Sequence, residues 1–304
     1  MDTRPITSKR LAASVIAVPP LARNSDGSLN SAANQAIIRH LENGGVSTLL
    51  YGGNANLYHT RPSEYPALLS MLESVAAPDT LIIPAIGPAF GVAMDQAEIL
   101  KESNFPTVMV LPHVGMLTMD GVEDGLRKIA EALGKPIVVY VKNEGYLEPK
   151  HVKSLVDSGL VSWIKYAIVR EDPAQDEYLK ELVDLVDPAL IVSGIGEQPA
   201  IIHMRDFGVI GFTSGCVCVQ PKLSMDMLGA IQDGDFESAE TIRKLFCPLE
   251  DERNAIQPIR VLHDAVAGAA IAETGPLLPY FQNLPEDDRA RVAGKAKELL
   301  ALTH

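Results

Sequence analysis

The sequence has few cysteines and no long apolar run. Its three cysteines, Cys216, Cys218 and Cys247, fit neither a disulfide framework nor the paired ligands of a zinc site. No stretch of about 18 or more apolar residues occurs, so no transmembrane helix is predicted. The first five residues are not followed by the apolar segment of a signal peptide. We therefore expect a cytoplasmic protein without disulfides.

Positive charge is also scarce. The chain of 304 residues has 26 Lys and Arg against 39 Asp and Glu, a net charge of −13. Nucleic-acid and membrane-surface binding both rely on basic surface, so neither is expected as a general function. An anionic small molecule needs only local positive charge and remains possible as a substrate. A hydrophobic content of 47% is typical of a globular protein.

Short apolar runs rich in β-branched residues recur along the chain and predict strands. They are residues 11–21, 46–51, 80–86, 107–111, 136–141, 161–167, 189–193 and 209–213. Segments with helical periodicity lie between most of them. Examples are residues 31–43, 63–76, 94–102, 121–133, 148–158 and 176–186. This alternation indicates βαβ units and a mainly parallel sheet.

Eight strands at this spacing predict an α/β fold, a (β/α)8 TIM barrel. An open doubly wound sheet is the alternative, but no G-x-G-x-x-G motif follows the first strand. The chain after about residue 221 is largely helical in pattern, with expected helices at 224–231, 236–245 and 254–272. We therefore divide the chain into a barrel, 1–222, and a C-terminal helical extension packed on it, 223–304.

Lys165 interrupts an apolar run, residues 161–167, that otherwise reads as a buried strand. Burial disfavours the charged form of a lysine and lowers its pKa, which suits an amine that must act as a Schiff-base nucleophile. Two alternatives are a lysine at the solvent end of the strand and one paired with an acid such as Glu171 or Asp172. The strand alone does not separate these interpretations.

Two further strand ends fit chemistry on a 2-oxo acid, because active sites of such barrels lie where the strands end. The turn Gly52-Gly53-Asn54-Ala55 offers backbone N–H groups that suit a carboxylate, although it is also compatible with a plain turn. Tyr140 ends an aliphatic strand, and a phenol near an imine-forming lysine can relay protons. By itself, Tyr140 is also compatible with a core aromatic.

With these residues in this order, the chain resembles the dihydrodipicolinate synthase / N-acetylneuraminate lyase superfamily of class I aldolases and dehydratases. The resemblance runs from residues 15–20 to the C-terminal helices and is strongest at Ile164-Lys165-Tyr166-Ala167. It implies a barrel, an imine between Lys165 and a 2-oxo acid, Tyr140 as the catalytic tyrosine, and a dimer or tetramer. Gly53 and Asn54 match the positions of the two carboxylate-binding hydroxyl residues of the family.

The chain departs from the family pattern at three places. The usual Gly-Thr-Thr-Gly-Glu motif reads Gly52-Gly53-Asn54-Ala55-Asn56. Lys142 and Asn143 stand near the arginine of the synthases, and no tyrosine occurs near His113. Lysine biosynthesis is therefore a poor fit. The run 140–143 and the tail 274–279 look more like the 5-keto-4-deoxyglucarate dehydratase branch.

These features predict a lyase that dehydrates or cleaves a 2-keto-3-deoxy sugar acid or a pyruvate-derived compound through a lysine imine. The iminium supplies the positive charge, so we expect neither a metal nor a cofactor. Side chains that could contact the substrate are Lys142, Ser193, Glu197, Ser214 and His113, each also compatible with a structural role. The alternatives are synthase-like pyruvate condensation, a non-catalytic 2-oxo-acid-binding barrel and a phosphate-binding isomerase.

Overall fold

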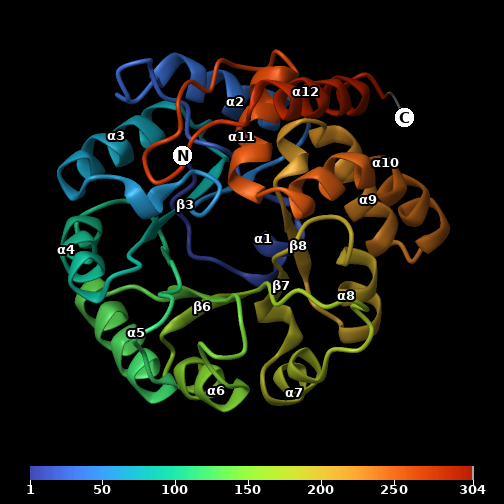
Figure 1. Ribbon diagram of the computed structural model, residues 1–304. Coiled ribbons are helices and arrows are strands. Elements are labelled where there is room, and N and C mark those ends of the chain that lie inside the picture. The colour runs from blue at the N-terminus through green and yellow to red at the C-terminus, as the bar shows by residue number, and fades with distance from the viewer. Residues whose placement is uncertain (303–304) are drawn as a thin grey trace.

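The centre of the computed structural model, which describes residues 1–302, is a closed barrel of eight parallel strands. Each strand pairs with the next one in the chain, and β1 pairs with β8 to close the ring (Figure 1). The strands are β1 (Ile16–Ala17), β2 (Thr48–Tyr51), β3 (Leu81–Ile86), β4 (Met109–Val110), β5 (Ile137–Val141), β6 (Val161–Tyr166), β7 (Ile191–Ser193) and β8 (Gly211–Ser214). The predicted (β/α)8 barrel is therefore confirmed.

Helices surround the barrel and follow its strands in turn (Figure 1). They are α2 (Ser31–Asn43), α3 (Tyr65–Val75), α4 (Phe90–Lys101), α5 (Met119–Leu133), α6 (Pro149–Asp157), α7 (Glu177–Leu185) and α8 (Ala200–Phe207). Short 3-10 turns lie at Leu57–His59, Pro62–Glu64, Pro188–Leu190 and Cys216–Cys218. Sequence signals set several boundaries: the Asn30 side chain accepts from the N–H of Ala33 at 3.0 Å and so caps α2.

The first strand is shorter than the sequence predicted. Residues 11–21 form an apolar run, but α1 (Ser8–Ala12) takes up its start and β1 holds only Ile16–Ala17. The hydroxyl of Thr7 accepts from the N–H of Arg10 at 3.2 Å and caps α1. A capping residue that precedes the apolar run therefore favours a helix at the start of that run.

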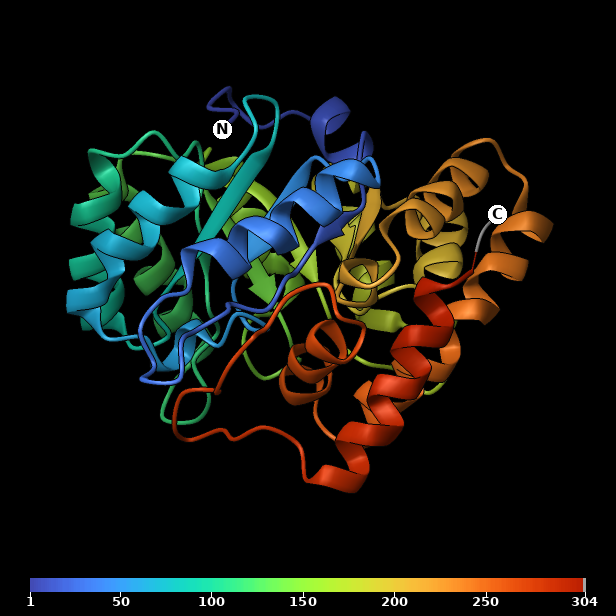
Figure 2. The same cartoon turned by 90° about the horizontal axis from the view of Figure 1, so that it is seen from above.

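Four helices form the C-terminal part of the chain, and α10 to α12 lie together on one side of the barrel (Figure 2). They are α9 (Pro221–Gln232), α10 (Phe236–Ala255), α11 (Pro258–Gly268) and α12 (Glu286–Leu300). The expected helix end near residue 245 is wrong, because α10 continues through Pro248 with Phe246 and Leu249 buried on either side. The border proposed at residue 222 falls inside α9 and stays a prediction.

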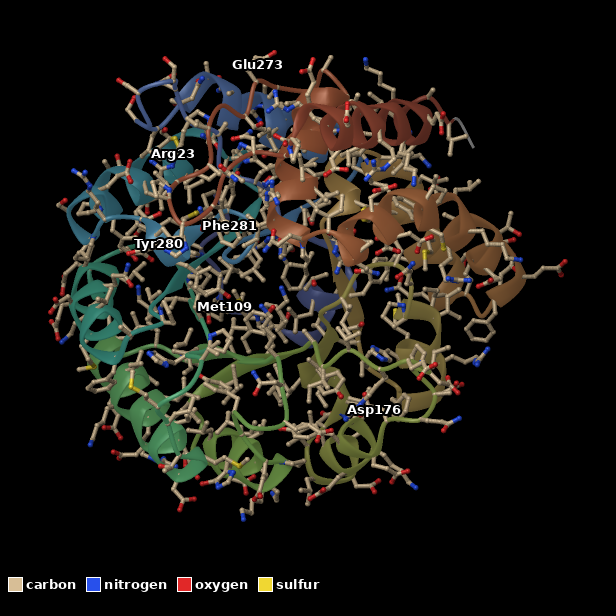
Figure 3. The ribbon with its side chains drawn as sticks, viewed as in Figure 1. Arg23, Met109, Asp176, Glu273, Tyr280 and Phe281 are labelled. Atoms are coloured by element: carbon tan, nitrogen blue, oxygen red, sulfur yellow. The ribbon has the colours of Figure 1, made fainter. Side chains whose placement is uncertain are left out.

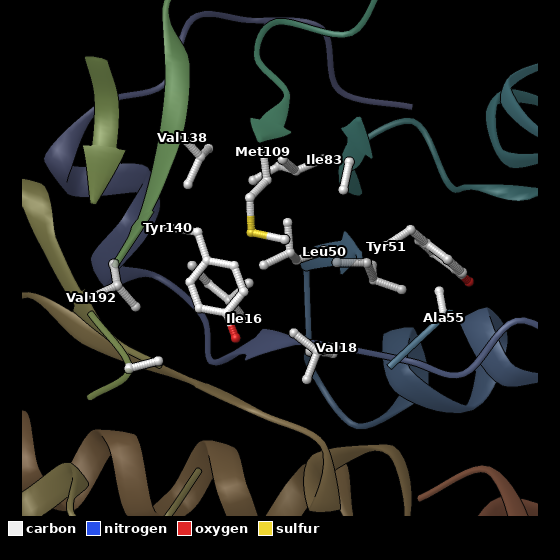
Figure 4. Close-up of a cluster of buried hydrophobic side chains, with 14 of the residues drawn as sticks. Ile16, Val18, Leu50, Tyr51, Ala55, Ile83, Met109, Val138, Tyr140 and Val192 are labelled. Atoms are coloured by element: carbon white, nitrogen blue, oxygen red, sulfur yellow. The ribbon is translucent and has the colours of Figure 1, made fainter. Parts of the chain in front are cut away.

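Side chains from successive strands fill the barrel interior (Figure 4). Ile16, Leu50 and Met109 lie in this cluster, which also contains the ring of Tyr140. Within residues 1–302, no helix combines the length and apolar character needed to cross a membrane. The packed interior leaves the strand ends as the place where polar side chains can meet.

Small residues allow the extension to pack closely. A methyl group on Gly215, just after β8, would lie 2.0 Å from Cδ1 of Leu262 in α11. One on Gly268 at the end of α11 would lie 2.6 Å from the Cβ of Ala293 in α12. Real Cβ atoms do not approach so closely, so both contacts need glycine.

We predict that Gly268→Ala lowers the free energy of unfolding by about 1–3 kcal/mol, because the added methyl group overpacks the contact between α11 and α12. Gly294→Ala is the matched control, since that glycine is exposed in α12 with open space around it. This control should be neutral or stabilising by about 1 kcal/mol. Urea unfolding of both variants measures the effect, and equal stabilities would contradict this packing.

Candidate active site

Lys165 lies on the interior face of the barrel near the end of β6. It pairs in register with Tyr140 of β5 and Val192 of β7. Paired residues of neighbouring strands point to the same face, so these three side chains share the barrel interior. Lys165 is 6% exposed, and no ion pair within residues 1–302 joins it to an acidic residue. Pairing with Glu171 or Asp172 is therefore excluded.

Burial lowers the pKa of Lys165 to about 7. Desolvation is the largest cause, and the nearby positive charges of Lys142 and Arg253 add to it. A large fraction of this amine is therefore neutral at physiological pH. A neutral amine has the free electron pair that attack on a carbonyl requires.

Tyr140 lies beside the amine. The Nζ atom of Lys165 is 4.7 Å from the centre of the Tyr140 ring. Burial raises the pKa of this phenol, so it stays protonated. Its hydroxyl makes no hydrogen bond within residues 1–302, and 9% of the residue is exposed, so the hydroxyl is unpaired but not completely enclosed. The hydroxyl is free to donate to a group bound at Lys165.

The turn after β2 presents unpaired backbone donors. The N–H groups of Gly53, Asn54 and Ala55 make no hydrogen bond within the part of the chain that the structure describes. The Asn54 side chain is partly occupied, because its Nδ2 donates to the carbonyl of Val18 at 3.1 Å. The backbone N–H groups are therefore stronger candidates for binding a carboxylate than the Asn54 side chain. The sequence suggested this role for the turn, because the turn lacks the usual hydroxyl residues of the family.

Lys142 and His113 lie at the rim of the barrel. Lys142 follows the end of β5, and its charge contributes to the low pKa of Lys165. His113 lines a cavity of about 810 Å³ together with Phe90 and Tyr146, and its Nδ1 lies 3.1 Å from the carbonyl of Gly115. A substrate-binding role for both residues stays a prediction.

Ser193 faces away from the interior. It pairs in register with Tyr166, which follows Lys165 and whose hydroxyl donates to Asp176, the residue that caps α7 and is labelled in Figure 3. The Ser193 hydroxyl lies 2.8 Å from Nδ1 of His203 in α8, and the residue is fully buried. This placement argues against the predicted contact with substrate, because alternate residues of a strand point to opposite faces.

Ser214 and Glu197 belong to a buried cluster. The hydroxyl of Ser214 and that of Ser224 each donate to the Glu197 carboxyl group at 2.7 Å. The N–H of Glu197 donates to Oε1 of Glu250 at 3.0 Å, and burial raises the pKa of both acids. Ser214 and Glu197 thus have internal partners, and their predicted contacts with substrate would require these bonds to change.

Two residues near the site escaped sequence analysis. A Cβ on Gly53 would lie 3.8 Å from the hydroxyl of Tyr58, and this phenol also raises the pKa of Tyr140. Arg253 in α10 lowers the pKa of Lys165. Tyr58 was detectable as an aromatic just after the strand-2 turn, whereas nothing local connects Arg253 to the barrel.

Within residues 1–302, no group of three or more His, Cys, Asp or Glu side chains is arranged to hold a metal ion. The structure brings an amine and a phenol together, and three unpaired backbone amides follow the end of β2 in the same barrel. Such a set can bind a carboxylate, form an imine and move protons.

Comparison with known proteins assigns the chain to a family. The model of the dihydrodipicolinate synthetase family matches residues 12–297. The 4-hydroxy-tetrahydrodipicolinate synthase of Methanocaldococcus jannaschii is 26% identical over 46% of this chain and 47% of its own length, so that match spans about half of each protein. A probable 5-dehydro-4-deoxyglucarate dehydratase of Pseudomonas syringae pv. tomato is 23% identical over 91% of this chain and 92% of its own.

A solved structure shares the fold. The dihydrodipicolinate synthase of Oceanobacillus iheyensis superposes with a TM-score of 0.83 at 21% identity, over 95% of this chain and 97% of that one. At this identity the likeness shows the barrel and its helical extension alone.

We predict that imine formation with pyruvate depends on pH with a midpoint near 7, rising as Lys165 loses its proton. Lys142→Met removes a like charge, so the midpoint should move upward by about half a pH unit or more. Labelling by pyruvate and cyanoborohydride across neutral pH, read by mass spectrometry, measures this. Lys153→Met, at an exposed surface pair with Asp157, is the control. A midpoint near that of free lysine would show that the amine is not desolvated.

Proposed function

The chain belongs to the dihydrodipicolinate synthetase family, whose members are lyases of the class I aldolase type. We propose that Lys165 is the residue that forms the Schiff base with a 2-oxo acid. One observation carries this proposal: a buried amine with a pKa of about 7 lies 4.7 Å from the ring of Tyr140 inside the barrel. Family membership gives the reaction type, whereas the roles of individual residues are inferred from their positions.

The first step is substrate binding and attack. The carboxylate of the 2-oxo acid accepts hydrogen bonds from the N–H groups of Gly53, Asn54 and Ala55. Neutral Lys165 then attacks C2, so that a C–N bond forms and the carbonyl oxygen takes up a proton. Tyr140 donates that proton and recovers one from the nitrogen, which gives the neutral carbinolamine. Tyr140 then protonates the carbinolamine hydroxyl, which leaves as water, so that the iminium forms beside the Tyr140 phenolate.

The iminium then activates C3. Its positive charge accepts electron density, which makes a C3 proton acidic. The Tyr140 phenolate takes up that proton to give an enamine, and the restored phenol then protonates the C4 hydroxyl, which departs as water and leaves the dehydrated product bound to Lys165. Cleavage of the C3–C4 bond of a 4-hydroxy acid releases an aldehyde instead. In both reactions water finally hydrolyses the iminium and regenerates the Lys165 amine.

We favour dehydration of a 2-keto-3-deoxy sugar acid. The dehydratase relative from Pseudomonas syringae aligns over 91% of this chain, whereas synthase relatives align over 46%, 72% and 74%. Lys142 and Asn143 also stand near the arginine of the synthases, and no tyrosine occurs near His113. Synthase-like condensation and non-catalytic binding of a 2-oxo acid are the outcomes that the experiments below distinguish.

We further propose that the protein assembles as a dimer or tetramer. Its loop after β4 carries two exposed apolar side chains, Val114 (81%) and Met116 (100%), beside the cavity that Phe90 lines. Exposed apolar surface of this kind is typical of contacts between subunits. Light scattering of the wild type and of Met116→Asp tests this: a smaller particle for the variant is expected, and a wild-type monomer would contradict it.

We predict that borohydride added with pyruvate fixes a stable adduct on the peptide that contains Lys165. Lys165→Ala and Lys165→Arg should lose the adduct and reduce turnover by about 10³-fold or more, because neither side chain forms an imine. Lys153→Ala removes an exposed lysine and is the control. Peptide mass spectrometry locates the label.

The outcomes separate the alternatives. Full turnover in Lys165→Ala would refute the imine mechanism. An adduct without turnover on any 2-keto-3-deoxy sugar acid would favour the non-catalytic barrel. Condensation of pyruvate with an aldehyde, and no dehydration, would favour the synthase-like activity.

A further inference from the structure

Arg253 extends from α10 toward the end of β7. Its Nη1 donates to the carbonyl of Ile195 at 2.9 Å and lies 3.2 Å from Oε1 of Glu250. A Cβ on Gly196 would lie 2.8 Å from this Nη1 and 2.1 Å from the Glu250 oxygen. The loop after β7 is thus shaped to let the guanidinium lie against it.

This loop also contacts the imine-forming lysine. A Cβ on Gly194 would lie 3.0 Å from Cγ of Lys165, and Ile195 is the next residue. The charge of Arg253 lowers the pKa of both Lys165 and Tyr140, an effect that requires proximity in a medium of low dielectric constant. The guanidinium therefore lies against the loop whose Gly194 approaches Lys165, although it comes from the C-terminal helices.

Part of the guanidinium remains available. Its Nε and Nη2 make no hydrogen bond within residues 1–302. Neither atom is completely enclosed by protein, so both can reach solvent or a ligand. Arg253 does not line the groove between α8 and α10, which Ile195, Gln198 and Asn254 help to form. These free donors therefore do not belong to that outer groove and lie beside the loop after β7, at the end of the barrel where the strands end.

The charge of Arg253 is not fully neutralised by its partner. Glu250 is completely buried, and burial together with the charge of Glu197 raises its pKa well above the usual value. A raised pKa favours the neutral form of this carboxyl group, whereas a guanidinium stays charged. Burial lowers the pKa of Lys142, whereas the Arg253 guanidinium supplies a permanent positive charge besides the amine that becomes the iminium.

We propose that Arg253 binds a second carboxylate of the substrate, remote from the 2-oxo group, and so selects 2-oxo acids that carry two anionic groups. This inference rests on the proposed function, since it takes Lys165 as the anchor of the other end. A guanidinium presents a planar fork of donors that matches a carboxylate. The C-terminal helices would thus contribute a specificity-determining residue to the barrel.

A purely structural role is the competing explanation, in which Arg253 only clamps the β7 loop to Glu250. The two roles differ in what they affect. A structural clamp acts on all substrates alike, whereas a carboxylate-binding residue acts on those with a second carboxylate. The ratio between two acids therefore separates them, because it cancels any change in stability or in the reactivity of Lys165.

The test compares imine formation with pyruvate and with 2-oxoglutarate, which adds a second carboxylate. Borohydride trapping over a range of concentrations gives a half-saturating concentration for each acid. We expect 2-oxoglutarate to half-saturate the wild type at a concentration lower by about 10-fold or more, as for a charge-assisted hydrogen bond. Arg253→Gln should abolish this preference, and Arg253→Lys should restore part of it.

Controls keep the test decisive. Arg243→Gln removes another arginine of α10, which pairs with Glu240, and should keep the preference. Because Arg253→Gln leaves Glu250 without its partner, the double variant Glu250→Gln/Arg253→Gln removes both groups together and should also lack the preference. Glu250→Gln alone keeps the guanidinium and should retain it.

The possible failures are distinguishable. Trapping of both acids with an unchanged ratio in Arg253→Gln and in the double variant would overturn the role of Arg253 and leave the imine chemistry intact. A wild type without any preference for 2-oxoglutarate would do the same. If neither acid were trapped on Lys165, the proposed function would fail and this inference with it.

Discussion

The desolvation of one amine is the constraint on which the site depends. A lysine inside a barrel is unfavourable in its charged form, and burial brings the pKa of Lys165 to about 7. The surroundings maintain this state, because the two charges that act on the amine, Lys142 and Arg253, have the same sign as its own. No acidic side chain within residues 1–302 forms an ion pair with it. The fold therefore accepts a cost in stability where a neutral nucleophile is needed.

The sequence predicted much of this arrangement from local signals. Alternating apolar strands and amphipathic helices indicated the barrel, and the lysine within an apolar run pointed to the site. Side-chain direction was harder to predict, since it depends on the register between strands: Ser193 pairs with Tyr166 and faces α8, while Val192 pairs with Lys165 and faces inward. Helix boundaries that depend on tertiary packing, such as the passage of α10 through Pro248, were also beyond local patterns.

The C-terminal helices are more than a cover for the barrel. Leu262 of α11 fits against Gly215 at the end of β8, and Arg253 of α10 reaches the loop after β7. Such contacts join residues far apart in the chain, so a single sequence gives no signal for them. We propose that a turn without the usual hydroxyl residues serves the site through such contacts: its backbone amides bind one end of the substrate, and a guanidinium from the extension binds the other.

A crystal structure of the protein reduced with borohydride in the presence of pyruvate tests the central claim most directly. We expect continuous density from Nζ of Lys165 to C2 of the reduced pyruvate, with its carboxylate at the N–H groups of Gly53, Asn54 and Ala55. The Tyr140 hydroxyl should lie within hydrogen-bonding distance of the linkage. Density on a different lysine, or an unmodified Lys165 under conditions that label the protein, would contradict the account.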